Sequence, residues 1–228
     1  MRLRARVTIA LLPALLLSSC GHDAQPSRAT TAHSSSPSTP TATEGPLVVF
    51  LGDSLAAGLH LDASDAFPAV LQRTLTEQGV PFRLINAGVS GDTTAGGLRR
   101  VDWLLKQQPD WVVLELGAND GLRGVQLTAI EANLRAIIAK VQAAGAGVLL
   151  LGLCLPPNYG GDYTSGFLAL YERIADDLAL PFVPCFIEGV GGVAELNLSD
   201  GIHPTAEGQR KLAEKLAPVL ARVLSESG

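Results

Sequence analysis

The sequence predicts an α/β fold, a three-layer α/β/α sandwich on a five-stranded parallel sheet with flavodoxin-like topology. Five short runs rich in Val, Leu and Ile recur along the chain, and segments with helical periodicity lie between them. The runs are continuously apolar rather than alternating, which is typical of strands buried on both faces of a parallel sheet. Strand–helix–strand alternation with right-handed crossovers then places helices on both sides of the sheet.

The elements follow in order along the chain. The first helix is expected to stop at Gly79, and Thr128 with Glu131 forms a capping-box pattern at the start of a later helix. The strands are expected at 47–51, 82–86, 111–116, 147–153 and 181–186. Four helical segments each carry one apolar stripe, namely Phe67, Val70, Leu71 and Leu75; Ile130, Leu134, Ile137, Ile138 and Val141; Phe167, Leu170, Tyr171, Ile174 and Leu178; and Leu212, Leu216, Val219, Leu220 and Val223.

Residues 1–19 have the pattern of a signal peptide. Arg2, Arg4 and Arg6 precede a short apolar stretch, which is too short for a membrane-spanning helix. The following Leu-Ser-Ser-Cys resembles the bacterial lipobox, so Cys20 is expected to be acylated and to anchor the protein at the periplasmic face of a membrane. The alternative is an ordinary signal with an incidental cysteine and a soluble periplasmic or secreted protein.

Composition divides the rest of the chain into a tether and one domain. Residues 20–45 are rich in Ser, Thr and Pro and are expected to remain disordered, whereas residues 46–228 are long enough for a single domain with a full core. Without residues 1–19 the chain has 14 Lys and Arg against 22 Asp and Glu, a net charge of −8. No basic patch is available for nucleic acid, and no later segment reaches transmembrane length.

Two cysteines, Cys154 and Cys185, remain in the domain. In an exported protein a pair of cysteines suggests a disulfide. Each lies in an apolar run, so two buried free thiols are an equally good interpretation.

A serine and a histidine stand in positions that suggest nucleophilic catalysis. Ser54 directly follows the first strand, and Asp200 lies three residues before His203 near the C-terminus. A serine hydroxyl becomes a nucleophile when a base accepts its proton, and a carboxylate can orient that base. His203 is the better base because His60 follows Ser54 by only six residues, although His60 is not excluded.

Two turns can supply donors for an oxyanion. Gly91 follows the second strand and Asn119 follows the third, so both are expected beside Ser54 at the carboxyl ends of the strands. The alternative is that both are ordinary turns. Ala56 stands where the Gly-x-Ser-x-Gly elbow requires its last glycine, which disfavours the α/β-hydrolase fold.

Four blocks together resemble the SGNH, or GDSL-type, hydrolases. They are Gly52-Asp53-Ser54-Leu55, Gly91 in Ser-Gly-Asp-Thr, Gly117-x-Asn119-Asp120 and Asp200-x-x-His203. The resemblance is closest to the bacterial periplasmic thioesterase–lysophospholipase–arylesterase branch. It implies Ser54 as nucleophile, His203 as base and Asp200 as its orienting group. It further implies an oxyanion hole of the Ser54 and Gly91 backbone N–H groups with the Asn119 amide, supported by Asp53 and Asp120.

The expected function is therefore that of a serine esterase with no metal or organic cofactor. The expected substrates are small acyl esters and lysophospholipids, with acyl thioesters as a further class, bound by a monomer near Leu122, Pro156, Asn158 and Tyr159. One rival is a carbohydrate O-deacetylase with the same catalytic residues, but the chain has only 6 Phe, 2 Trp and 3 Tyr for a sugar-binding groove. A non-catalytic lipoprotein scaffold is a further alternative.

Overall fold

The computed structural model describes residues 45–226. The predicted signal peptide, Cys20 and nearly all of the predicted tether lie outside this part of the chain. The strands are β1 (Leu47–Gly52), β2 (Arg83–Asn86), β3 (Trp111–Glu115), β4 (Gly147–Leu151) and β5 (Phe182–Val183). The helices of at least two turns are α2 (Phe67–Glu77), α3 (Thr94–Leu105), α5 (Leu127–Ala143), α6 (Gly161–Asp177) and α7 (Ala206–Ser225).

Shorter elements follow the strands and form much of the edge where the strands end. They are the α-helices α1 (Ser54–Ala57) and α4 (Ala118–Leu122) and the 3-10 helices η1 (Ala63–Asp65), η2 (Pro157–Tyr159) and η3 (Ala194–Leu196).

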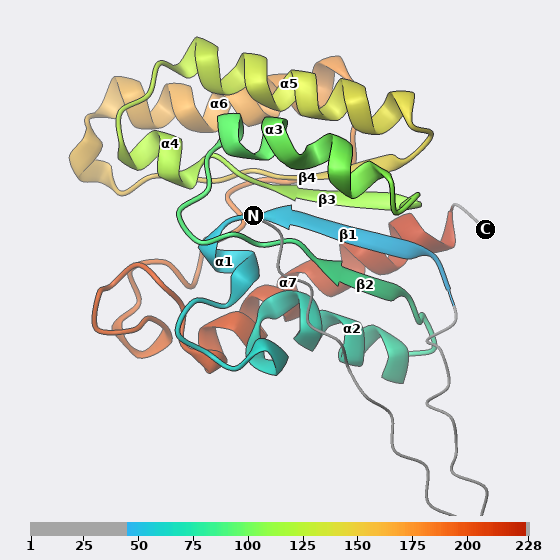
Figure 1. Cartoon of the computed structure of the whole chain (residues 1–228). Helices are drawn as coiled ribbons and strands as arrows, with labels where there is room; N and C mark the ends of the chain where they lie inside the picture. Colours follow the sequence, from blue (N-terminus) through green and yellow to red (C-terminus); the bar gives the residue numbers. More distant parts are fainter. Residues whose placement is uncertain (1–44, 227–228) are drawn as a thin grey trace, which may run out of the picture. The chain divides into compact units, whose positions relative to one another are not determined.

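The five strands form one parallel sheet in the order β2-β1-β3-β4-β5. Helices α3, α5 and α6 cover one face, and α2 and α7 cover the other (Figure 1). The predicted three-layer sandwich with flavodoxin-like topology is therefore confirmed. The strand order reverses direction between β1 and β3, and open α/β sheets bind their ligands beside such a switch point.

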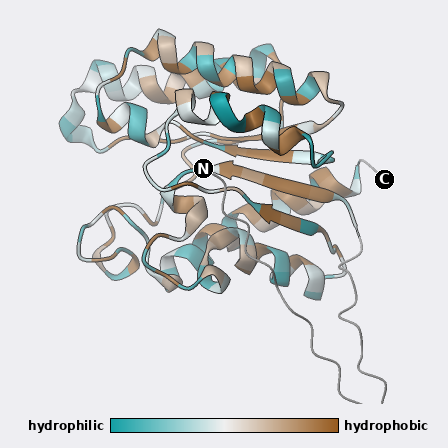
Figure 2. Ribbon diagram, viewed as in Figure 1, coloured by the Kyte–Doolittle hydropathy of each residue, from teal (hydrophilic) through white to brown (hydrophobic). Residues whose placement is uncertain are grey.

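The core lies on both faces of the central strands. All six residues of β1 are buried, and the helices turn their apolar stripes toward the sheet (Figure 2). The expectation of burial on both faces is wrong for β2, because this edge strand exposes Arg83 and Asn86 and only half-buries Leu84 and Ile85. Gly79, with φ of +80°, follows the end of α2 as expected.

Helix α3 was not among the expected helices. Its sequence opens Thr94-Ala-Gly-Gly, and glycines disfavour a helix interior. Here both are required by close packing, since a Cβ at Gly96 would lie 1.7 Å from Asp92 Oδ1 and one at Gly97 would lie 2.2 Å from the Leu116 side chain. Tertiary contacts therefore override the local propensity.

Two local expectations are corrected. The capping box is wrong: α5 begins at Leu127 without a side-chain cap, and Glu131 instead pairs with Arg135 and Arg173. The fifth strand is also much shorter than 181–186, because Cys185 adopts a φ of +36° and turns the chain away.

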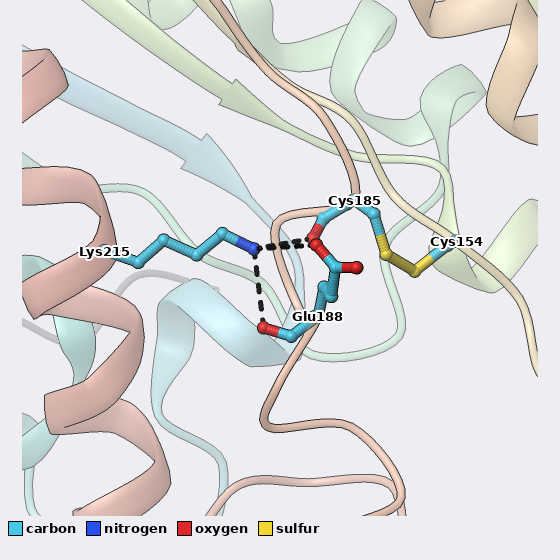
Figure 3. Close-up of a disulfide and its surroundings, with 4 residues drawn as sticks. All are labelled: Cys154, Cys185, Glu188 and Lys215. Carbon is cyan, nitrogen blue, oxygen red and sulfur yellow. Dashed lines mark hydrogen bonds and ion pairs between the residues drawn. A yellow bond between two sulfur atoms is a disulfide. The ribbon is translucent and has the colours of Figure 1, made fainter.

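Cys154 and Cys185 are joined as a disulfide that links the segments following β4 and β5 (Figure 3). Lys215 of α7 donates from Nζ to the Cys185 carbonyl at 3.0 Å and lies 3.9 Å from a Glu188 carboxylate oxygen. The bridge joins these two loops to each other, and Lys215 joins the loop after β5 to α7.

In the described residues no helix combines the length and apolarity that crossing a membrane requires.

Replacing both domain cysteines by serine should lower the free energy of unfolding by ~3–4 kcal/mol, because the bridge closes a loop with a sequence separation of 31 residues. Urea denaturation under non-reducing conditions measures the change. In a Cys20→Ala background, the protein unfolded without reductant should show no titratable thiol. Two free thiols would contradict the bridge.

Candidate active site

Ser54 lies where β1 ends and α1 begins. Asp53 is the N-cap of α1, and its Oδ1 accepts a hydrogen bond from the Leu55 backbone N–H at 3.0 Å. Gly58, with a left-handed φ of +64°, ends the helix after one turn. This short turn holds the Ser54 side chain at the carboxyl edge of the sheet, where it is 9% exposed.

His203 connects Ser54 to Asp200. His203 Nε2 lies 3.0 Å from Ser54 Oγ, and His203 Nδ1 lies 2.7 Å from Asp200 Oδ2. The structure thus brings together three side chains that the sequence singled out. A neutral imidazole in this arrangement, with its proton on Nδ1, presents an unprotonated Nε2 to the hydroxyl.

The loop that carries the histidine is organised by its own aspartate. Asp200 Oδ1 accepts the backbone N–H groups of Ile202 and His203, at 2.9 and 3.0 Å. The backbone N–H and then the ring of His203 hold the pKa of Asp200 well below its ordinary value. The carboxylate therefore stays charged and fixes the imidazole ring while remaining exposed to solvent.

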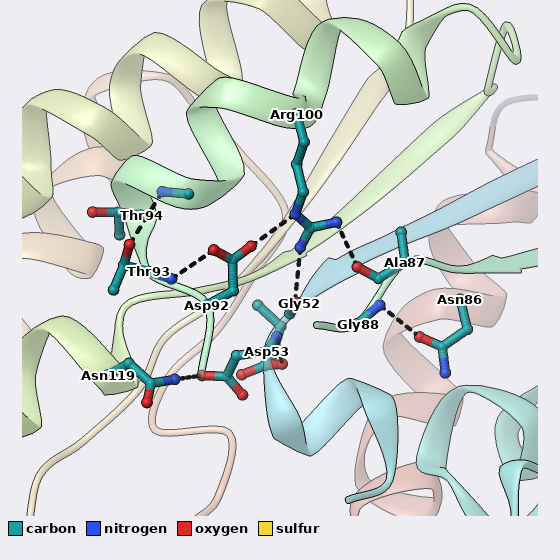
Figure 4. A network of polar contacts seen from close by, with 12 residues as sticks. Gly52, Asp53, Asn86, Ala87, Gly88, Asp92, Thr93, Thr94, Arg100 and Asn119 are labelled. Atoms are coloured by element: carbon teal, nitrogen blue, oxygen red, sulfur yellow. Dashed lines mark hydrogen bonds and ion pairs between the residues drawn. The ribbon is translucent and has the colours of Figure 1, made fainter. Parts of the chain in front are cut away.

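Asn119, in α4, reaches the same edge from the third strand. Its Nδ2 donates to Asp53 Oδ2 at 3.1 Å (Figure 4). Gly117 precedes α4 with φ of +124°, and a Cβ there would lie 2.1 Å from the Tyr171 hydroxyl oxygen. An amide nitrogen carries two hydrogens, so the bond to Asp53 leaves one N–H available for another acceptor.

Asp120, the residue after Asn119, contacts the start of α3. Its two carboxylate oxygens accept the Thr94 hydroxyl and backbone N–H, both at 2.8 Å, and Asn133 in turn donates to the Thr94 hydroxyl. Asp120 thereby fastens α4 to the start of α3, and so supports the turn that presents Asn119.

Glu115 lies beneath the turn that carries Ser54 and was not singled out from the sequence. Its carboxyl is fully buried, and its Oε2 accepts the Asp53 backbone N–H at 3.1 Å. Burial, then the charge of Asp53, raises the pKa of Glu115 well above its usual value. Burial also raises the pKa of Asp53 to about 6, opposed by the Leu55 N–H and the nearby His203. Burial therefore favours the neutral form of both carboxyl groups, and the charge of Asp53 further opposes ionisation of Glu115.

His60, the other histidine considered as a base, also lies near the site. It is exposed, adopts a φ of +68°, and its ring centre lies 6.3 Å from that of His203 with the planes at 88°. Of the two histidines considered as bases, only His203 contacts the serine hydroxyl.

Gln209, in the second turn of α7, links three elements below the site. Its Nε2 donates to the Leu55 carbonyl at 3.1 Å, and its Oε1 accepts the Phe67 backbone N–H at 2.9 Å. The side chain is 1% exposed. It therefore ties the helix that follows His203 directly to the residue after Ser54.

The four predicted substrate-binding residues are more exposed to solvent than Ser54. Leu122 is half-buried at the end of α4, while Pro156, Asn158 and Tyr159 are exposed on the loop after β4.

A hollow of about 380 Å³ lies at the opposite edge of the sheet, lined partly by Pro46, Asp110 and Trp111. Among residues 45–226, no group of three or more His, Cys, Asp or Glu side chains is placed to hold a metal ion.

The fold and this arrangement define a serine ester hydrolase of the α/β/α class. The chain belongs to the GDSL-like Lipase/Acylhydrolase family, whose model matches residues 50–211. It is 45% identical to Esterase TesA of Pseudomonas aeruginosa over 178 residues, which covers 78% of this chain and 89% of that protein. It is 42% identical to "Thioesterase 1/protease 1/lysophospholipase L1" of Escherichia coli, over 76% of this chain and 82% of the relative.

Solved structures agree with these relatives. A crystal structure of TesA matches with a TM-score of 0.75 and 46% identity, covering 78% of this chain and 99% of that one. The esterase EstA from Pseudoalteromonas sp. matches with a TM-score of 0.75 and 34% identity, covering 79% and 99%. The expected family and its esterase branch are therefore confirmed, and the protein is a carboxylic ester hydrolase.

Replacing Gln209 by Met should lower the free energy of unfolding by about 2–4 kcal/mol, since the Leu55 carbonyl and Phe67 N–H would both lose a buried partner. The matched control is Gln72→Met in α2, which removes one part-buried bond to the Phe82 carbonyl far from Ser54. Urea denaturation should show a clearly smaller loss for the control. Equal losses in the two variants would contradict a special role for the Gln209 link.

Proposed function

We propose that Ser54 is the nucleophile, His203 the general base and Asp200 the residue that orients it. The observation that carries the proposal is the relay from Asp200 Oδ2 to His203 and on to Ser54 Oγ, at 2.7 and 3.0 Å. Distances in this range allow a proton to pass from the hydroxyl to the imidazole as the oxygen attacks an acyl carbon. No metal or organic cofactor takes part in the proposed reaction.

The acylation step begins with attack of Ser54 Oγ on the ester carbonyl. The new C–O bond forms while His203 Nε2 takes the hydroxyl proton, and Asp200 stabilises the resulting imidazolium. The carbonyl oxygen becomes an oxyanion, which the Ser54 and Gly91 backbone N–H groups and the free N–H of Asn119 are proposed to bind. Collapse breaks the bond to the leaving alcohol or thiol, which receives the proton from His203.

Deacylation repeats these steps with water. His203 accepts a proton from the attacking water, and the acyl–serine bond breaks to release the carboxylic acid and restore the Ser54 hydroxyl. The bond from Asn119 to Asp53 supports the assignment of the amide, because it holds the Nδ2 group in one orientation throughout. Asp53 and Asp120 thus act as supports for the hole rather than as reacting groups.

The proposed substrates are small acyl esters and lysophospholipids, with acyl thioesters as a further class. The names of the relatives support this range, which includes an Arylesterase of Vibrio mimicus that is 39% identical over 78% of this chain. We propose that the acyl chain lies near Leu122, Pro156, Asn158 and Tyr159, on the loops that follow β3 and β4. We propose that the protein acts as a monomer, with all of its proposed catalytic groups on one chain.

A carbohydrate O-deacetylase is the second candidate. An Acetylxylan esterase of Geobacillus stearothermophilus is 23% identical over 74% of this chain, an identity well below that of the esterase relatives.

We also propose that the protein is exported and anchored to a membrane through Cys20. The signal-like residues 1–19 and the lipobox-like Leu-Ser-Ser-Cys support this proposal.

Ser54→Ala should lower kcat by at least about 10⁴-fold, because it removes the attacking oxygen. The melting temperature should stay nearly unchanged, since only one hydroxyl is lost. The matched control is Ser165→Ala, on the exposed side of α6, which should keep full activity.

Hydrolysis of p-nitrophenyl butyrate and octanoate, lysophosphatidylcholine and acetylated xylan completes this test. Faster turnover of the aryl esters and the lysophospholipid is expected. Full activity of Ser54→Ala would place the nucleophile elsewhere, and a preference for acetylated xylan would favour the deacetylase.

Cells that express the full chain should incorporate radioactive palmitate into the protein, and the Cys20→Ala variant should not. The reason is that acylation requires the Cys20 thiol at the cleavage point. Membrane fractionation of the same cells should recover the wild type with the membranes and the variant in the soluble fraction. Equal labelling of the two proteins would rule out Cys20 as the anchor.

A further inference from the structure

Arg100, in α3, contacts three separate segments beside the nucleophile turn. Its Nη2 donates to the Gly52 carbonyl at 2.9 Å, its Nη1 to the Ala87 carbonyl at 2.6 Å and its Nε to Asp92 Oδ2 at 2.7 Å (Figure 4). Gly52 stands two residues before Ser54. Ala87 and Asp92 lie on either side of Gly91. One guanidinium therefore joins the end of β1 to both ends of the loop that presents Gly91.

The chemistry of these contacts requires an arginine. Three acceptors in different directions match the rigid fork of N–H donors on a guanidinium, whereas a lysine ammonium is a single point on a flexible stem. The group is largely enclosed, with 22% of its side chain exposed and 11% of that of Asp92. Its charge is balanced by Asp92, whose other oxygen accepts the Thr93 backbone N–H at 2.9 Å.

The loop from residue 86 to residue 93 is also held against α1 on its other side. Asn86 donates from Nδ2 to the Ala56 carbonyl at 2.6 Å, and the Gly88 N–H donates to Asn86 Oδ1 at 3.0 Å. A Cβ at Gly88 would lie only 2.3 Å from the Ala57 backbone nitrogen. The loop therefore packs backbone to backbone against the helix that starts at Ser54.

The parallel pairing of β1 with β2 continues into the first part of this loop through backbone hydrogen bonds. The Ala87 N–H donates to the Phe50 carbonyl at 2.9 Å, and the Val89 N–H donates to the Gly52 carbonyl at 3.1 Å. Beyond Val89 the chain leaves β1 and turns through Gly91, which has a φ of +78° and is exposed. The contact between Arg100 and Asp92 holds the loop again after this turn.

We propose that Arg100 is a positioning residue that sets the separation of the Gly91 N–H and the Ser54 N–H. This inference rests on the proposed function, in which those two groups bind the oxyanion. Oxyanion donors act over 2.7–3.1 Å, so a shift of a few tenths of an ångström in the loop weakens transition-state binding. Arg100 acts through the backbone that it holds, because its three bonds all go to groups of the protein.

The role predicts a particular kinetic pattern. Ground-state substrate binding depends on the acyl pocket, whereas the two backbone donors contact a charge that forms only during the reaction. Loss of positioning should therefore lower kcat and leave KM nearly unchanged. A merely structural role would lower stability and leave the kcat of the folded fraction at the wild-type value.

The experiment compares Arg100→Ala and Arg100→Lys in the full-length protein, with p-nitrophenyl butyrate as the substrate. We expect kcat to fall by about 10–100-fold in Arg100→Ala, with KM within about twofold, because one donor of the hole becomes misplaced. The inhibition constant of butaneboronic acid, which forms a tetrahedral adduct with the serine, should rise by a similar factor. Adding guanidinium ion at non-denaturing concentration should restore part of the kcat of Arg100→Ala.

The matched controls are Arg135→Ala and Arg135→Lys. Arg135 also pairs with two carboxylates, Glu131 and Asp177, but on the helices away from Ser54. These variants should keep the wild-type kcat and show no response to guanidinium. If Arg100→Ala does not fold, Arg100→Lys carries the test, and a reduced kcat with unchanged KM is still expected.

A wild-type kcat and boronate affinity in Arg100→Lys would overturn the proposal, whatever its melting temperature. So would a rise in KM with kcat unchanged, which would make Arg100 a substrate-binding group. These outcomes leave the proposed function standing, provided that Ser54→Ala remains inactive. An active Ser54→Ala would overturn the proposed function itself.

Discussion

The hydrogen bond between His203 and Ser54 joins residues 149 positions apart, and the proposed chemistry depends on that contact being held at 3.0 Å. Neither residue fixes the separation by itself, because Ser54 begins a one-turn helix and His203 lies on a loop. The distance is set by larger elements. The Ser54 turn rises from the fully buried strand β1, whereas the His203 loop is closed by an antiparallel bridge between Asn197 and Pro204 and leads into α7. The buried Gln209 side chain then connects α7 to the turn that carries Ser54.

The carboxyl pair under this turn costs stability. Asp53 and Glu115 are both buried, and the pKa of Asp53 is raised from 3.8 to about 6. The folded protein binds this proton more tightly than the unfolded chain does. The resulting stabilisation is fully present below pH 3.8 and is lost as the pH rises to about 6, an amount on the order of 3 kcal/mol. At neutral pH the fold therefore bears the cost of a buried anion, which accepts the hydrogen bond from Asn119.

The sequence predicted the parts of the site that lie within one segment. Ser54 at a strand end, the spacing of Asp200 and His203, and Asn119 after the third strand are local patterns, and the sheet brings their segments together. Asp53 and Asn119, both expected near Ser54, are hydrogen-bonded to each other. What the sequence missed consists of contacts between distant segments. Glu115 bonds a residue 62 positions away, Arg100 one 48 positions away and Gln209 one 154 positions away.

The same distinction explains the errors in the fold. The strands were found because continuous apolar runs need no knowledge of their partners. Helix α3 was missed because Gly96 and Gly97 are required by Asp92 and Leu116, which local propensity does not include. Of the missed residues, only Glu115 had a local signal, as a lone charged residue in an otherwise apolar predicted strand.

The two sides of the site are held by different interactions. On the side of β1, β2 and β3, a dense set of hydrogen bonds around Arg100, Asp53 and Asn119 fixes the loops. On the side of β4 and β5, the fifth strand has only two residues, and long loops follow both strands. Few backbone pairs are available there, and the Cys154–Cys185 bridge supplies a covalent link instead. Since the loop that carries Asp200 and His203 follows β5, the side of the site with the weakest sheet pairing also carries the proposed base.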